Sequence, residues 1–395
     1  MKVYGRGIAL SAVLCTTLLA GAADSAEVEV LRQEVQALKQ SVAELKNSSE
    51  SASLQHDIAE LKAGLESNSK GGFQIAGYAA FDWQDAQGSD NEFSGVKFAP
   101  IFHAQYGDIF QFEGEVEFST TSEGETDAEL EYAAGTIFLN DYMGLQIGKF
   151  MSPLGQFVQN QHPSWINKLP NTPVGFGHDG AAPTSNVGMA LRGGLPKVSE
   201  IRSNYVLFVS NAPVYGVAAD GDVIIDATGK TSAGDVSKTW GGRFALNPVG
   251  GMEVGVSGAL GKASEELISN EKIARDYDAF GVDFMYNFEG IDIKAEYIEQ
   301  SIGENELSTL EGGTWRAMYG QVSYQFASLK LEPVLRYSDY HNPETERNQW
   351  AVGLNYLFAN NLIAKLAYEY NTNEDSAGEA SINDNRVSAQ LAFGF

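Results

Sequence analysis

Five glutamates near the first third of the chain recur at every second position. Glu113, Glu115 and Glu117 form one run, and Glu129 and Glu131 form another. Alternate side chains of an extended strand point to the same face, so each run predicts a row of carboxylates on one face. Such rows attract cations and hold basic neighbours on adjacent strands, but they contain no nucleophile. The expected chemistry is therefore electrostatic.

Basic residues occupy the matching face of other predicted strands. They are Lys97, Arg192, Arg202, Arg243, Lys330, Arg336, Lys365 and Arg386. Most of these lie on strands other than those of the five glutamates, and charges separated in this way set up a field that sorts solutes by charge. Pairing of opposite charges across strands, which would only stiffen the wall, is the alternative. Both interpretations place these side chains on one inner surface.

The histidines give no support for catalysis. They are His56, His103, His162, His178 and His341. None lies beside a recognisable nucleophile, and the spacing His-x-x-x-His that binds a metal on a helix does not occur. We therefore expect no enzyme activity, no metal and no cofactor.

The elements that carry these residues are strands, because apolar side chains alternate with polar ones from Phe73 onward. Phe110, Phe112 and Phe118, for example, face away from the three glutamates between them. About sixteen such segments of roughly ten residues follow, the length that transmembrane strands need. They start near residues 73, 95, 109, 128, 143, 186, 201, 239, 252, 278, 291, 315, 329, 349, 362 and 386.

The connections alternate between short and long. Two-residue links such as 107–108 and 289–290 are followed by polar stretches such as 211–238 and 262–275. Transmembrane barrels have this rhythm, with tight turns at one end and long loops at the other. The sequence thus predicts an all-β, 16-stranded antiparallel transmembrane barrel over residues 71–395, with aromatics toward lipid and charges toward water.

The longest connection, from Phe150 to Asn186, predicts a loop that folds into the barrel and narrows it. Five prolines stiffen it. An ordered loop that faces outward is the alternative. Its candidate anchors and polar groups are His162, Trp165, Lys168, His178 and Asp179.

The N-terminal residues predict export. Residues 1–22 combine a basic start, an apolar stretch and small residues at the end, as secretory signal peptides do. Residues 23–70 carry Val and Leu in steps of three and four, which predicts a short α-helical coiled coil in the periplasm. Beyond the N-terminus no apolar run of about twenty residues occurs, which excludes a helical membrane protein. The net charge of −26 excludes a nucleic-acid partner.

The final strand ends in Phe393 and Phe395. It resembles the C-terminal assembly signal of bacterial outer-membrane barrels, which implies the barrel assembly machinery and outer-membrane lipid as partners.

The order of these parts resembles the phosphate-selective porin O/P type and is similar to dicarboxylate-channel porins that bear coiled coils. The local likeness covers residues 73–81 and 145–155. The resemblance implies a homotrimer that passes small, often anionic solutes. The sequence lacks the dense arginine ladder or lysine ring of phosphate-specific members, and glutamates stand in the predicted lumen instead.

We therefore interpret the chain as a porin of a Gram-negative outer membrane, through which ions and small hydrophilic solutes diffuse passively. The cation or anion preference stays open, because the narrowest ring sets it rather than the total charge. An anion-selective channel for phosphate or dicarboxylates is one alternative. A non-conducting structural or adhesive barrel, tethered by the coiled coil, is another.

Overall fold

The computed structural model describes residues 72–88, 91–177, 180–218, 221–231, 238–375 and 385–395, together with position 36. The predicted signal peptide (1–22) lies outside the described residues, and so does the predicted coiled coil (23–70) except for position 36. His178 and Asp179 also lie outside them. No helix in the described part of the chain is long and apolar enough to span a membrane.

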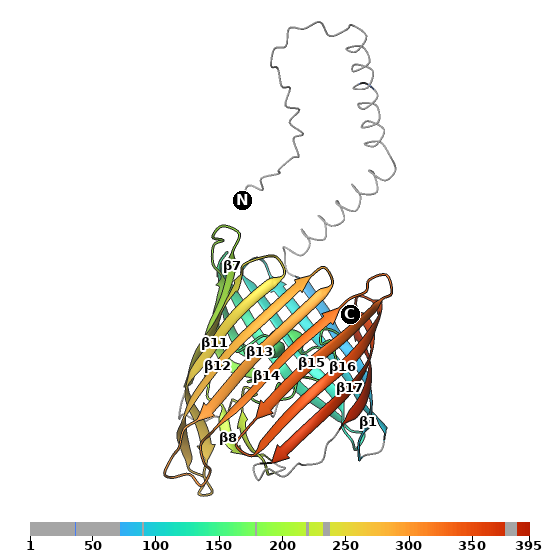
Figure 1. The fold of residues 1–395 in the computed structure, drawn as a ribbon. Coiled ribbons are helices and arrows are strands. Elements are labelled where there is room, and N and C mark those ends of the chain that lie inside the picture. The colour runs from blue at the N-terminus through green and yellow to red at the C-terminus, as the bar shows by residue number, and fades with distance from the viewer. Residues whose placement is uncertain are drawn as a thin grey trace, which may run out of the picture. The chain divides into compact units, whose positions relative to one another are not determined.

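The described residues form a β-barrel (Figure 1). Its first seven strands are β1 (Gly72–Ala86), β2 (Glu92–Tyr106), β3 (Phe110–Thr120), β4 (Thr126–Asn140), β5 (Met143–Met151), β6 (Ser185–Gly194) and β7 (Arg202–Asn211). The other nine are β10 (Lys238–Asn247), β11 (Met252–Glu266), β12 (Lys272–Phe288), β13 (Ile291–Ile302), β14 (Gly313–Tyr324), β15 (Leu331–His341), β16 (Thr345–Ala359), β17 (Leu362–Asp375) and β18 (Arg386–Gly394).

Each of these sixteen strands pairs antiparallel with its neighbour in the chain, β7 pairs with β10, and β18 returns to β1. The closed ring leaves no free sheet edge among them. The predicted 16-stranded antiparallel barrel is confirmed. The expected start of β5 at residue 143 is correct, and that of β1 at residue 73 is one residue late.

One predicted long loop is wrong. Residues 262–275 comprise the end of β11 and the start of β12, joined by a turn at 267–271. Lys262 and Asp276 form an exposed ion pair across this ribbon. The segment is polar because Lys262, Glu266 and Asp276 meet water on one face, whereas the other face buries the ion pair between Arg275 and Glu265, at 2.6 Å. Polarity alone does not distinguish a strand from a loop there.

A second correction concerns residues 211–238, which the sequence predicts to be an outer loop without structure. This connection forms a small hairpin of two strands, β8 (Val214–Val217) and β9 (Val223–Asp226), which are not members of the sixteen-strand ring. β8 runs parallel to β11 at Ser264 and Glu265. Tyr215 and Ile225 are buried. The hairpin therefore packs against the barrel instead of extending from it.

Side chains alternate between the two faces of the wall as expected. On β16, Trp350, Val352 and Leu354 are outward and exposed, whereas Gln349 and Asn355 are inward and buried. On β13, Lys294, Glu296 and Gln300 are likewise inward and buried. This barrel has an apolar exterior and a polar interior, the reverse of a soluble barrel.

Candidate functional site

Residues 152–184, between β5 and β6, form a segment that crosses the inside of the barrel; we call it the inner segment. It contains a single π-helical turn, Phe157–Gln161. Its residues contact inward side chains of β13, β15, β17 and β18. β15 lies eight strands from β5 in either direction round the ring. The inner segment therefore reaches the opposite wall.

The wall holds the inner segment mainly through its backbone. Arg336 donates to the carbonyl oxygens of Asn171 and Thr172 at 3.0 and 3.1 Å. Gln300 donates to the carbonyl of Ala181 at 2.7 Å. Further carbonyls of the segment accept hydrogen bonds from Asn355, Lys365 and Gln390. These contacts satisfy backbone groups that the segment buries away from water.

A buried carboxylate fixes the start of the inner segment. Glu296 Oε2 accepts the backbone N–H groups of Gln156 and Phe157 at 3.0 and 2.8 Å. The preceding residue is Gly155, with φ +86°, and a Cβ there would lie 1.8 Å from Glu296 Oε1. Only glycine combines this backbone angle with so close a carboxylate.

The structure places three of the predicted loop residues inside the barrel. Lys168 Nζ forms an ion pair with Glu332 Oε1 on β15 at 2.7 Å. Trp165 packs over Gly394 of β18, where a Cβ would lie 2.9 Å from the indole. His162 contacts the carbonyl of Val158 through Nδ1, at 2.6 Å, within the π-helical turn. Lys168 and Trp165 thus fix the segment to β15 and β18.

Three predicted pore-lining cations face inward but are covered. Arg336 and Lys365 lie beneath the inner segment, 0 % and 3 % exposed. Arg243 is enclosed by Asp283, at 2.6 and 2.9 Å, and by Glu253, at 2.7 Å. They are wrong as open pore-lining residues, because packing and pairing, rather than solute, occupy their charges.

Two predicted basic residues lie near the turns. Lys330 is wrong as a wall residue, since it is in the turn before β15, with φ +56°, and donates to the carbonyl of Phe358. Arg202 is the first residue of β7 and is exposed. Neither contributes to the middle of the lumen.

The predicted acidic wall is present on β3 and β4, but much of it is paired. Glu117 binds Lys97 at 2.7 Å, and Glu113 contacts His103 at 2.9 Å. Glu115 is 1 % exposed. Glu129 lies opposite Glu117. Glu131 is the extra residue of a β-bulge, so the strict alternation of faces is interrupted at Glu131 and Tyr132. Among these residues cross-strand pairing, the alternative interpretation, accounts for part of the pattern.

Arg192, on β6, lies beside this acidic wall. Its Nη1 contacts Gln146 at 3.4 Å. Together with Glu113 and Glu115 it lines a cavity of about 240 Å³ between the wall and the inner segment.

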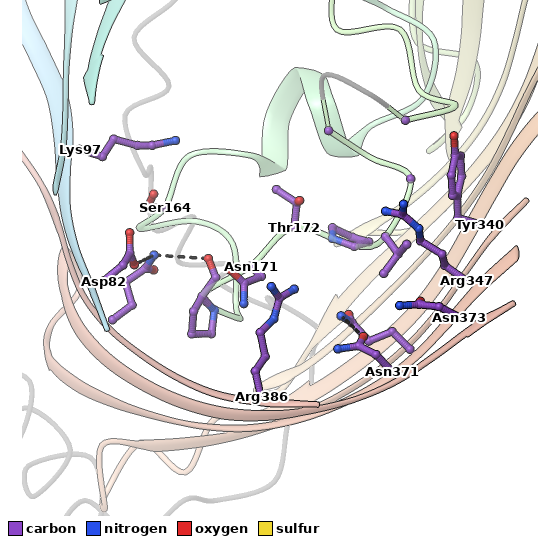
Figure 2. Close-up of a pocket in the computed structure, with 18 residues that line it drawn as sticks. Asp82, Lys97, Ser164, Asn171, Thr172, Tyr340, Arg347, Asn371, Asn373 and Arg386 are labelled. Carbon is purple, nitrogen blue, oxygen red and sulfur yellow. Dashed lines mark hydrogen bonds between the residues drawn. The ribbon is translucent and has the colours of Figure 1, made fainter. Parts of the chain in front are cut away.

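A larger opening, of about 480 Å³, borders Ser164 and residues 170–175 of the inner segment. Its described lining includes the cations Lys97, Arg347 and Arg386 and the carboxylate Asp82. Figure 2 shows these side chains reaching into one space from β1, β2, β16 and β18, with Thr172 of the inner segment between them. We call this space the basic cavity.

Sequence reasoning missed Arg347 and Asp82. Arg347 follows Glu344 and Glu346 in a polar stretch that indicates a loop, although it belongs to β16 and pairs with Tyr340 and Asn373 on the neighbouring strands. Arg347 lies two residues before Gln349 and eight before Asn355, and this even spacing places all three on the inward face, whereas Trp350, three residues away, is outward. That register was the available signal.

The β8–β9 hairpin contacts other loops. Tyr215 OH donates to the carbonyl of Glu311, and the N–H of Val223 donates to Glu344 at 3.3 Å. Burial raises the pKa of Asp226, but hydrogen bonds from Lys230 and Thr228 outweigh it and hold that pKa below its usual value. Asp226 therefore stays ionised and ties the end of the hairpin to the chain that follows.

The described residues include no group of three or more His, Cys, Asp or Glu side chains arranged to hold a metal ion.

The comparisons with known proteins agree with this architecture. Residues 212–332 match the family described as the S-layer protein SlpA, β-barrel domain. No curated protein matches the chain.

Several solved porins are similar in structure. The outer-membrane channel DcaP of Acinetobacter baumannii has a TM-score of 0.56 at 10 % identity, over 83 % of this chain and 98 % of that one. The anion-selective porin of Comamonas acidovorans gives 0.55 at 10 %, over 82 % and 100 %. OmpF of Salmonella typhi, in complex with daunomycin, gives 0.54 at 13 %, over 83 % and 99 %. The barrel fold is that of the porins.

Proposed function

We propose that the chain is an outer-membrane porin through which ions and small hydrophilic solutes diffuse. The observation that carries this proposal is a closed 16-strand barrel whose polar interior keeps an opening of about 480 Å³ beside the inner segment. Charged side chains around that opening require water, because an empty apolar space would leave them unsolvated. The porin fold of the similar structures supports the same function.

In this proposal the inner segment is the constriction. It reaches the far wall and is held there by ion pairs and backbone hydrogen bonds, so it narrows the lumen without a moving part. The predicted coiled coil would lie in the periplasm, and three copies would form the working unit. We assign no catalytic role to the chain.

Single-channel recording tests the proposal. The mature protein is reconstituted in planar bilayers, and current is recorded in KCl. We expect an open, ohmic conductance that appears in steps of three for trimers. Folded protein that inserts and never conducts would overturn it.

An anion preference is a second candidate, favoured by the three cations and one carboxylate that line the basic cavity. The expected result is a reversal potential of anionic sign in a KCl gradient. A cationic sign would show that the acidic wall on β3 and β4 governs passage instead.

A structural envelope barrel is a third candidate. The match of residues 212–332 to the barrel domain of an S-layer protein supports it, as does the predicted coiled coil, which would act as a tether. The same recording decides between this candidate and the porin, because a structural barrel need not conduct.

A further inference from the structure

The charges of the basic cavity are not equally available to a solute. Lys97 binds Glu117 at 2.7 Å, and Arg386 binds Glu369 at 2.5 Å. Arg347 is exposed and has no ion-pair or hydrogen-bond partner among the residues that the structure describes. Because the other two cations already hold a carboxylate each, Arg347 is the cation that can receive an anionic group without breaking a pair.

The position of the cavity's carboxylate limits how much negative charge a solute can carry. Asp82 lies on β1 and accepts a hydrogen bond from Gln390 at 2.7 Å, across the cavity from Arg347 in Figure 2. A second anionic group on the solute would either approach Asp82 or compete with Glu117 and Glu369. Both cost free energy, so one anionic group is favoured over two.

Side chains that suit hydroxyl groups surround Arg347. Gln349 lies next to it on the inward face of β16, Asn371 and Asn373 lie on β17, and Thr172 faces them from the inner segment. Carboxamides both donate and accept hydrogen bonds, as hydroxyl groups do. Gln349 and Asn371 are buried, and Gln349 bridges Arg336 and Asn371 at 3.3 and 3.0 Å. Asn373 and Thr172 are the accessible polar side chains beside Arg347.

We propose that the basic cavity is a recognition site for hydroxylated organic monoanions of the sugar-acid class. The carboxylate binds the Arg347 guanidinium, and the hydroxyl groups bind Asn373 of β17 and Thr172 of the inner segment. The inference rests on the proposed porin function, for which it names the solute class and Arg347 as the residue that determines specificity.

The test uses sorbitol, gluconate and glucarate, which share one carbon chain and carry no, one and two carboxylates. Binding to detergent-solubilised protein is followed by saturation-transfer NMR, and block of KCl current is followed in planar bilayers. We expect gluconate to bind and block at the lowest concentration. Arg347→Gln should weaken gluconate about tenfold, as loss of one charge-assisted contact predicts, and leave sorbitol unchanged.

Two controls separate charge from fold. Arg347→Lys should restore part of the preference for gluconate, since the charge remains but the planar fork is lost. Arg316→Gln removes an exposed arginine from the outward face of β14 and should change nothing.

Each remaining outcome decides a separate point. Equal binding of the three solutes, or inorganic phosphate competing as well as gluconate, would overturn the assignment to sugar acids. A conducting wild-type channel with no gluconate effect would overturn the inference and keep the porin. Gluconate binding by a barrel that never conducts would overturn only the porin.

Discussion

At the scale of single residues, burial separates inward charges that hold the barrel together from those that line an opening. Arg243 and Asp283 are almost fully enclosed, whereas Arg347 and Lys97 stand in an open cavity. The alternation of the sequence puts both kinds on the inner face and cannot distinguish them. An inward charge is buried when the inner segment or a carboxylate on a neighbouring strand covers it. These contacts join residues that are distant in sequence.

The Arg243–Asp283 pair should contribute strongly to stability. Asp283→Asn leaves a buried guanidinium with Glu253 as its remaining carboxylate, and we expect the free energy of unfolding to fall by about 3 kcal/mol. Urea unfolding in lipid vesicles, followed by tryptophan fluorescence, measures this. Lys197→Gln, which breaks an exposed pair with Glu200, should cost less than about 1 kcal/mol. Equal losses in the two variants would contradict the prediction.

At the scale of elements, strands were more predictable than connections. The alternation of a strand is a local signal, because the polarity of each residue indicates which face of the wall its side chain occupies. Residues 262–275 resemble a loop in sequence because charged side chains lie on both faces, and the β8–β9 hairpin gives little signal because each of its strands has four residues. The crossing of the lumen by residues 152–184 was expected from length and prolines, but its anchors, Glu296 and Gln300 on β13 among them, required the folded register.

Glu296 should hold the start of the inner segment against β13. The sequence contains one cysteine, Cys15, within the predicted signal peptide, so Val158→Cys gives a mature chain with a single thiol. Val158 is buried, and maleimide should label it slowly. Adding Glu296→Ala leaves two buried N–H groups without their acceptor, which costs about 1–3 kcal/mol for each, and should raise the labelling rate by at least about tenfold.

Glu299→Ala is the matched control for this labelling. Glu299 lies on the same strand and pairs with Tyr297 OH at 2.5 Å, away from the inner segment. It should leave the rate unchanged. An equal acceleration in both variants would mean that β13 as a whole, rather than the anchor, had loosened.

At the scale of the whole molecule, Phe395 extends the seam that closes the barrel between β18 and β1. Phe395 exchanges backbone hydrogen bonds with Gly77 at 2.9 and 3.0 Å, and its ring stacks on Phe98 with centroids 5.9 Å apart. The end of the chain, which the sequence predicts to be an assembly signal together with Phe393, is therefore also part of the seam between β18 and β1. A sequence pattern cannot separate these two roles.

Phe395→Ala separates them. Its backbone can still pair with Gly77, so refolding into detergent should fall by less than about twofold, whereas the amount of folded barrel in the outer membrane of cells should fall about tenfold if assembly factors recognise the ring. Heat-modifiable gel mobility measures both. Leu391→Ala, on the outward face of β18, is the control. Equal losses in detergent and in cells would assign Phe395 to the seam alone.

The way in which the wall binds the inner segment bears on how such proteins diverge. Gln300, Arg336, Asn355, Lys365 and Gln390 all donate to its backbone carbonyls. A carbonyl is the same in every amino acid, so these anchors fix the path of the segment and place little restriction on its side chains. Residues such as Ser164 and Thr172, which border the opening, can then be exchanged while the route stays constant. Mutation can thus alter the chemistry of the opening without rebuilding the barrel.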